Sequence, residues 1–183
     1  MATKSELEEM LLKMQFNQME NYKIHKKVKI QNLSALEVSF YPETLNERDA
    51  LKGILLDPYA ISEKFDYNEI KAQIRANNFL FVGKDGMGQH ATIRICDFEM
   101  YKDLFELPDA TEHPVQLTED VIEMLIAEND KQTFKEKLSE YVATKNEAAT
   151  LVDYLENKKH MMDELPGWKK NMVLEYYKKI FWR

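Results

Sequence analysis

The spacing of apolar residues changes once along the chain, near residue 97, and this change constrains the fold more than any other feature. Before it, several segments alternate apolar and polar residues, as half-buried strands do. After it, apolar residues recur every three or four positions, which predicts helices. Gly and Pro are scarce, five each among 183 residues, so long regular elements are favoured. The sequence predicts an α+β fold: a small antiparallel sheet of two hairpins with packed helices, followed by a C-terminal helical bundle.

Two hairpins are predicted in the first half of the chain. The segment 23–31 would pair with 35–41 through a turn near residue 32. The segment 79–83 would pair with 89–96 through Asp85-Gly86, a dipeptide typical of two-residue turns. The first of these strands is rich in lysine, which is typical of a sheet edge protected against aggregation. Its lysines are Lys23, Lys26, Lys27 and Lys29.

Helical spacing and capping residues divide the rest of the chain. Helices are predicted at 5–20, 46–56, 67–77, 98–106, 118–128, 131–143, 146–161 and 168–181. Residues 1–107 would form a mixed α/β part and residues 115–183 a helical part, packed together as one globular unit. No linker rich in glycine, serine or proline separates the two parts.

Composition favours a protein of the cytoplasm that needs no cofactor. No apolar run reaches the ~20 residues of a membrane span, and the first ten residues lack the apolar core of a secretory signal. The lone Cys96 cannot form an internal disulfide, which fits a reducing compartment. No spacing of histidine, cysteine or acidic residues matches a metal site or a catalytic motif. We therefore expect no membrane partner, no metal, no cofactor and no enzymatic activity.

The last predicted helix suggests the leading functional hypothesis. Its apolar side chains extend around more of its circumference than a single buried stripe needs. Tryptophan and tyrosine are favoured in protein interfaces, so these residues are candidates for partner binding. The candidates are Trp168, Met172, Tyr176, Tyr177, Phe181 and Trp182. We expect a non-enzymatic interaction protein with a regulatory or assembly role, which binds a protein partner or a second copy. The alternative is that this helix is the centre of the bundle.

Nucleic-acid binding is a second hypothesis. The predicted order over 46–96 is helix, turn, helix, strand, tight turn, strand, which resembles the second half of a winged helix-turn-helix. Basic residues on the second helix, in the turn and on the last strand could contact phosphate. They are Lys71, Arg75, Lys84 and Arg94. Net charge is −7, but residues 22–96 are slightly basic while 97–150 are strongly acidic.

A third hypothesis concerns His90. His90-Ala91-Thr92 resembles one half of the paired His-x-Thr arrangement of two-histidine phosphoesterases, in which one histidine acts as acid and the other as base. The remaining histidines, at 25, 113 and 160, are not followed two positions later by serine or threonine. This hypothesis therefore requires a second histidine close to His90 in the folded chain.

Overall fold

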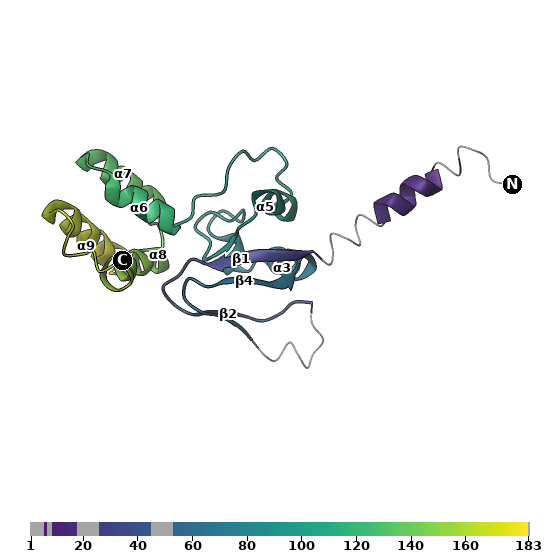
Figure 1. Ribbon diagram of the computed structural model, residues 1–183, viewed down its shortest axis with the longest axis horizontal. Coiled ribbons are helices and arrows are strands. Elements are labelled where there is room, and N and C mark those ends of the chain that lie inside the picture. Colours follow the sequence, from purple (N-terminus) through teal and green to yellow (C-terminus); the bar gives the residue numbers. More distant parts are fainter. Residues whose placement is uncertain (1–5, 7–8, 18–25, 45–52, 183) are drawn as a thin grey trace.

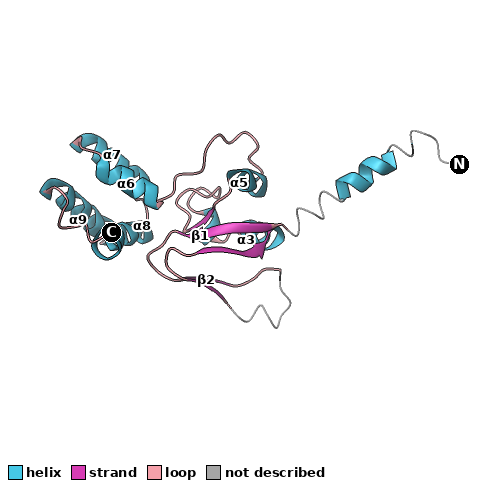
Figure 2. Ribbon diagram, in the orientation of Figure 1, coloured by secondary structure: helices cyan, strands magenta, loops and turns pink. Residues whose placement is uncertain are grey.

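The computed structural model describes residues 6, 9–17, 26–44 and 53–182. Within them the chain has the predicted α+β class: two small antiparallel sheets, packed helices and a helical region at the C-terminal end. Figure 1 shows this helical region on one side of the sheets and the helical residues 9–17 projecting from the other. Figure 2 distinguishes helices from strands in the same view.

A three-stranded sheet lies at the centre of the first half. Its order is β4-β1-β5, and both pairings are antiparallel. The strands are β1 (Lys27–Asn32), β4 (Ile61–Asp66) and β5 (Ile93–Ile95). Val28 and Ile30 are buried together because alternate side chains of a strand share a face. Because β1 lies between β4 and β5, its lysines are on a central strand, and the predicted edge strand is wrong.

The predicted pairing of 23–31 with 35–41 is wrong. The strand that follows β1 is β2 (Val38–Phe40), and it pairs instead with β3 (Ile54–Leu56). The buried Asn32 explains why β2 leaves β1 and pairs with β3. Its side-chain amide donates hydrogen bonds to backbone oxygens at three positions, at 2.9, 3.2 and 2.9 Å. These positions are Leu36, Leu56 and Asp57. The helix predicted over 46–56 is also wrong where it overlaps β3, and residues 46–52 lie outside the described part of the chain.

The predicted hairpin over 79–96 is also wrong as a pair of strands. Phe79–Val82 form a short helix, α4, because the side chain of Asn78 accepts a hydrogen bond from the amide of Leu80 and caps it. The chain still turns back tightly after α4. Gly83 has a positive φ of 61°, and a Cβ atom there would lie 2.0 Å from the backbone oxygen of Gln89, so only glycine fits. The strand β5 begins beyond this turn.

The remaining helices confirm the helical predictions closely. They are α3 (Tyr67–Arg75), α5 (Phe98–Phe105), α6 (Glu119–Ala127), α7 (Lys131–Tyr141), α8 (Lys145–Asp153) with a π-helical turn η1 (Tyr154–Lys158), and α9 (Gly167–Phe181). Residues 6 and 9–17 are helical as well, in agreement with the helix predicted over 5–20. Thr118 caps α6 as predicted. Throughout the described ranges, no helix is both long enough and apolar enough to cross a membrane.

Buried apolar residues form two clusters. The first is built on the three-stranded sheet, α3, α4 and α5, and centres on side chains such as Ile30, Ile70 and Phe81. The second is built on α6 to α9 and includes Leu125 and Tyr154. We call these the sheet core and the helical core.

Candidate functional site

The first half of α9 belongs to the helical core. The Trp168 ring meets the edge of Phe134 with their centroids 5.5 Å apart. Lys169 is buried beside them, and its ammonium group donates a hydrogen bond to the backbone oxygen of Ile126. Val173, one turn further along, is also buried. Trp168 therefore acts as a packing residue, whatever the rest of the helix does.

The second half of α9 is more open. Tyr177 and Phe181 stack on one another with centroids 4.4 Å apart, and both are half-buried against the helical core. Met172 and Tyr176 are half-buried too. Trp182 follows the last turn and is 87% exposed. Five of the six residues predicted to bind a partner are thus half-buried, and only Trp182 is exposed.

The predicted nucleic-acid-binding residues lie in different surroundings. Lys71 on α3 forms an ion pair with Glu106 at 3.3 Å. Lys84 donates a hydrogen bond to the backbone oxygen of Ala143 at 2.9 Å, just beyond the end of α7. Arg75 is exposed in the last turn of α3, and Arg94 is half-buried on β5.

The element order in this segment differs from a winged helix. Residues 53–96 form strand, strand, helix, short helix, loop and strand. The predicted helix-turn-helix with its hairpin is therefore not formed within these residues. Nucleic-acid binding stays a prediction, which a steep loss of affinity with added salt would support.

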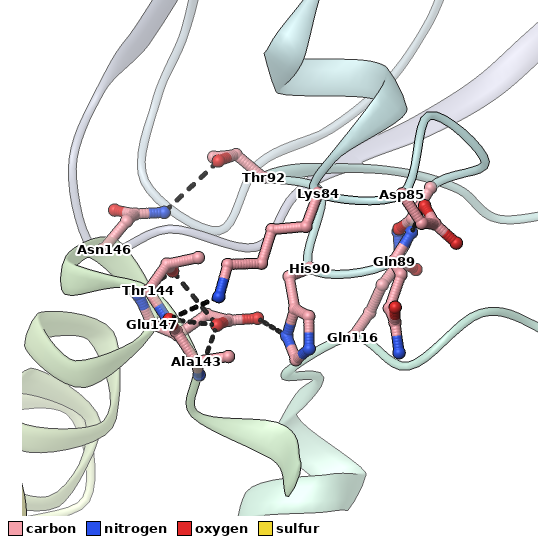
Figure 3. A network of polar contacts seen from close by, with 11 residues as sticks. Lys84, Asp85, Gln89, His90, Thr92, Gln116, Ala143, Thr144, Asn146 and Glu147 are labelled. Atoms are coloured by element: carbon pink, nitrogen blue, oxygen red, sulfur yellow. Dashed lines mark hydrogen bonds and ion pairs between the residues drawn. The ribbon is translucent and has the colours of Figure 1, made fainter. Parts of the chain in front are cut away.

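His90 lies at the junction between the two cores, as Figure 3 shows. Its backbone has a positive φ of 58°, and its amide donates to the oxygen of Val115 at 2.7 Å. Its Nδ1 lies 2.8 Å from Oε1 of Glu147, and both side chains are buried. The other oxygen of Glu147 accepts bonds from the amides of Ala143 and Thr144 at 2.9 and 3.0 Å. Glu147 thus completes the capping box of α8 and also contacts His90 on the sheet side of the junction.

Further hydrogen bonds extend this junction. The hydroxyl of Ser34 donates to Oδ1 of Asn146 at 2.7 Å, and Nδ2 of Asn146 reaches the hydroxyl of Thr92 at 3.4 Å. We call the five residues Ser34, His90, Thr92, Asn146 and Glu147 the polar seam. Since every member bonds across the junction, the polar seam fixes how the two cores are joined.

The polar seam does not supply the paired histidines of a phosphoesterase. In the described part of the chain, no hydrogen bond joins His90 to another histidine, to a hydroxyl or to a thiol. His113 packs against the ring of Phe98, and Nδ1 of His160 lies near the backbone oxygen of Glu156. His25 lies outside the described residues. His90 and Glu147 resemble a base and its orienting carboxylate, but the hydroxyl beside them, that of Thr144, donates to Glu147 and not to the His90 ring.

Part of the polar seam carries a signal that the sequence analysis missed. Thr144-Lys-Asn-Glu147 has the form of a capping box directly before a helical apolar pattern. That motif places the start of α8 at residue 145, not at 146 as predicted. The partnership of Glu147 with His90 has no local signal, because 57 positions separate the two residues.

Neither a metal site among the described residues nor a similarity to known proteins indicates a function for this chain. Among the residues that the structure describes, no three histidine, cysteine or acidic side chains are grouped to hold a metal ion. No protein-family model, no curated protein and no solved structure matches the chain. A functional proposal must therefore rest on its contacts, exposures and charges.

Proposed function

We propose that this is a non-enzymatic interaction protein with a regulatory or assembly role, which docks a protein partner on the C-terminal end of α9. The observation that carries the proposal is the 87% exposure of Trp182 beside rings that are only half-buried. A tryptophan brings a large contact area at a small cost in conformational entropy, and it is among the commonest residues at the centre of interfaces.

The neighbours of Trp182 provide a firm base for such a contact. Tyr177 and Phe181 are already stacked and packed on the helical core, so a partner would not have to order them. Groups that are ordered before binding lower the entropy cost of association. The surface is therefore suited to receive a preformed apolar pocket on another protein.

Charge near Trp182 indicates the kind of partner. Lys178 and Lys179 are exposed in the last turn of α9, within four positions of Trp182 in the sequence. Cations beside an apolar anchor favour an acidic partner surface, which speeds encounter and sets orientation. We commit to an acidic protein that offers a pocket for an aromatic ring.

A photoreactive amino acid at position 182 of the full chain would identify the partner, with the same probe at the exposed Tyr41 as a control for chance contacts. The purified partner is then titrated with the Trp182→Ala and Tyr41→Ala variants. We expect Trp182→Ala to weaken binding about tenfold or more, and Tyr41→Ala to leave it unchanged. Reversal of both lysines to glutamate should slow association and reduce its dependence on salt.

Two results would overturn this proposal. One is equal affinity of the wild type and Trp182→Ala for the cross-linked protein. The other is cross-linking to this chain alone, with a dimer in sedimentation that Trp182→Ala dissolves, because the occupant would then be a second copy. Thermal melting of Trp182→Ala checks that the exposed ring adds little to the fold.

A further inference from the structure

The helical residues 9–17, which we call the N-terminal helix, project from the sheets with their apolar side chains uncovered (Figure 1). In the described part of the chain thirteen large apolar side chains are exposed, and five of them belong to this helix. These five are 52–67% exposed and belong to neither the sheet core nor the helical core. They are Met10, Leu11, Leu12, Met14 and Phe16. Large apolar side chains gathered in one exposed place mark an interaction site.

The apolar side chains surround most of the N-terminal helix. At 3.6 residues per turn, Met10 and Met14 lie one turn apart on one side. Leu12 and Phe16 lie one turn apart on nearly the opposite side, and Leu11 lies between the two pairs. The apolar arc thus covers ~240° of the circumference. A surface that buries this arc must close around the helix as a groove does, because a flat face would leave one of the pairs in water.

The remaining strip of the helix is narrow and negatively charged. Glu6, Glu9 and Lys13 follow one another along it at intervals of three and four residues. Lys13 donates a hydrogen bond to Glu9 at 2.8 Å, and the two carboxylates outnumber the one ammonium group. The rim of a groove that holds the helix would face this strip. Basic groups on the rim would complement its charge.

Two other occupants suit this helix less well. A coiled coil with a second copy buries only a narrow seam and is sustained over three or more heptads, whereas nine residues make little more than one heptad. A helix that lies on a lipid surface carries lysine and arginine on its polar strip, and this strip carries more acid than base. The wide apolar arc, the short length and the negative strip together favour a groove on another protein.

We propose that the N-terminal helix inserts into an apolar groove with a basic rim on a partner protein. The helix lies on the other side of the sheets from α9 (Figure 1), and this docking does not depend on the surface around Trp182. A basic rim does not suit the acidic partner proposed for α9. If both proposals hold, the chain therefore brings two different proteins together, and only this last step rests on the proposed function.

The test captures the partner first and then measures its affinity. A photoreactive amino acid is placed at position 12 of the full chain, with the same probe at Leu36, whose side chain is 61% exposed between β1 and β2, as the control. The protein captured at position 12 is identified, purified and titrated against the full chain by calorimetry. We expect binding that weakens as salt is added, because the basic rim meets the negative strip. Capture no stronger than at Leu36, or an affinity that ignores salt, overturns the proposal.

Alanine variants show whether the partner closes around the helix. Leu12→Ala and Met10→Ala remove apolar side chains from opposite sides, and each should weaken binding about tenfold or more. Leu36→Ala should bind with unchanged affinity. Alanine is a better helix former than leucine or methionine, so a loss cannot come from unwinding of the helix. A loss in only one of the two helix variants would mean contact with a flat face and would exclude the groove.

Further measurements separate this surface from α9 and from the other occupants. Trp182→Ala should bind the captured protein with full affinity, and a tenfold loss would mean that the contact belongs to α9. A dimer in sedimentation that Leu12→Ala dissolves would make the occupant a second copy. Flotation with vesicles of phosphatidylcholine and phosphatidylglycerol that Leu12→Ala abolishes would make it a lipid surface. Each of these three results contradicts docking of the helix in a protein groove.

Discussion

The polar seam has a neighbour, a cavity lined by β5, the segment before α6, and the helices α6 and α7, and the two regions differ in how their buried polar atoms are paired. Both are tied to the same loop: His90 bonds the backbone of Val115, and Gln116 bonds the backbone of Gly88. In the polar seam the carboxylate of Glu147 has partners on both oxygens. In the walls of the cavity, Nε of Arg94, Nδ1 of His113 and Oε1 of Gln116 are buried and have no partner among the described residues. A fully paired network stabilises the junction between the two cores, whereas unpaired buried polar atoms lower the stability of the fold.

A second satisfied carboxylate shows that this chain can pair its buried groups elsewhere. Glu69 on α3 accepts bonds from the amides of Glu43 and Thr44 at 2.9 and 3.0 Å and from the side chain of Gln73 at 2.7 Å. Burial raises the pKa of Glu69, but the hydrogen bonds from Gln73, Thr44 and Glu43 outweigh it and lower the pKa below its ordinary value. Glu69 thus fastens residues 43 and 44 to α3. The unpaired atoms of the cavity are a local exception.

The largest effect is expected in the polar seam, from Glu147→Ala. This change removes the capping box of α8 and leaves His90 and two backbone amides buried without an acceptor. We expect a loss of about 3 kcal/mol in the free energy of unfolding, measured by urea denaturation at neutral pH. Glu136→Ala, on the exposed face of α7, is the control and should change stability by less than about 0.5 kcal/mol. Equal stabilities for the two variants would show that the polar seam does not hold the cores together.

Sequence patterns predict the second half of the chain more accurately than the first, for a physical reason. In α5, α6, α7 and α9 every backbone bond closes within four residues, so local spacing and caps such as Thr118 were sufficient. Strand pairing joins distant segments, and nothing near β1 in the sequence identifies β4 and β5 as its partners. The apolar run Phe79–Val82 suits a strand or a buried helix, and only the Asn78 cap decides between them.

The candidate sites were predictable only where one helix contains them. The aromatic residues of α9 were identified because they recur along a single predicted helix. Arg94 was identified as basic, but its place in a cavity depends on a fold that brings β5 beside α6 and α7. Gln116 and His113 belong to no motif. What sets them apart is an unpaired buried atom in each side chain, which no sequence pattern records.

A smaller effect of opposite sign is expected from Arg94→Met. The variant removes a buried donor that has no partner and keeps an apolar side chain of similar length. We expect the free energy of unfolding, measured by urea denaturation, to lie between no change and a gain of about 1 kcal/mol. Destabilisation as large as that of Glu147→Ala would mean that Arg94 is paired in solution, and the contrast between the polar seam and the cavity would disappear.

The smallest effect concerns His113 and the pH dependence of stability. Burial and the charge of Arg94 lower the pKa of His113 below its ordinary value of 6.5, which it regains on unfolding. The unfolded chain therefore binds this proton more readily, so the contribution is complete above pH 6.5 and is lost as the pH falls through and below that value. His113→Gln, which cannot titrate, should flatten the decline in unfolding free energy between neutral and mildly acidic pH, while the exposed His160→Gln should not. In Arg94→Met the decline should be shallower but still present, because burial continues to act on the ring. A decline of the same slope in wild type and His113→Gln would mean that the ring is open to water, and the contrast between the polar seam and the cavity would then lose one of its three unpaired atoms.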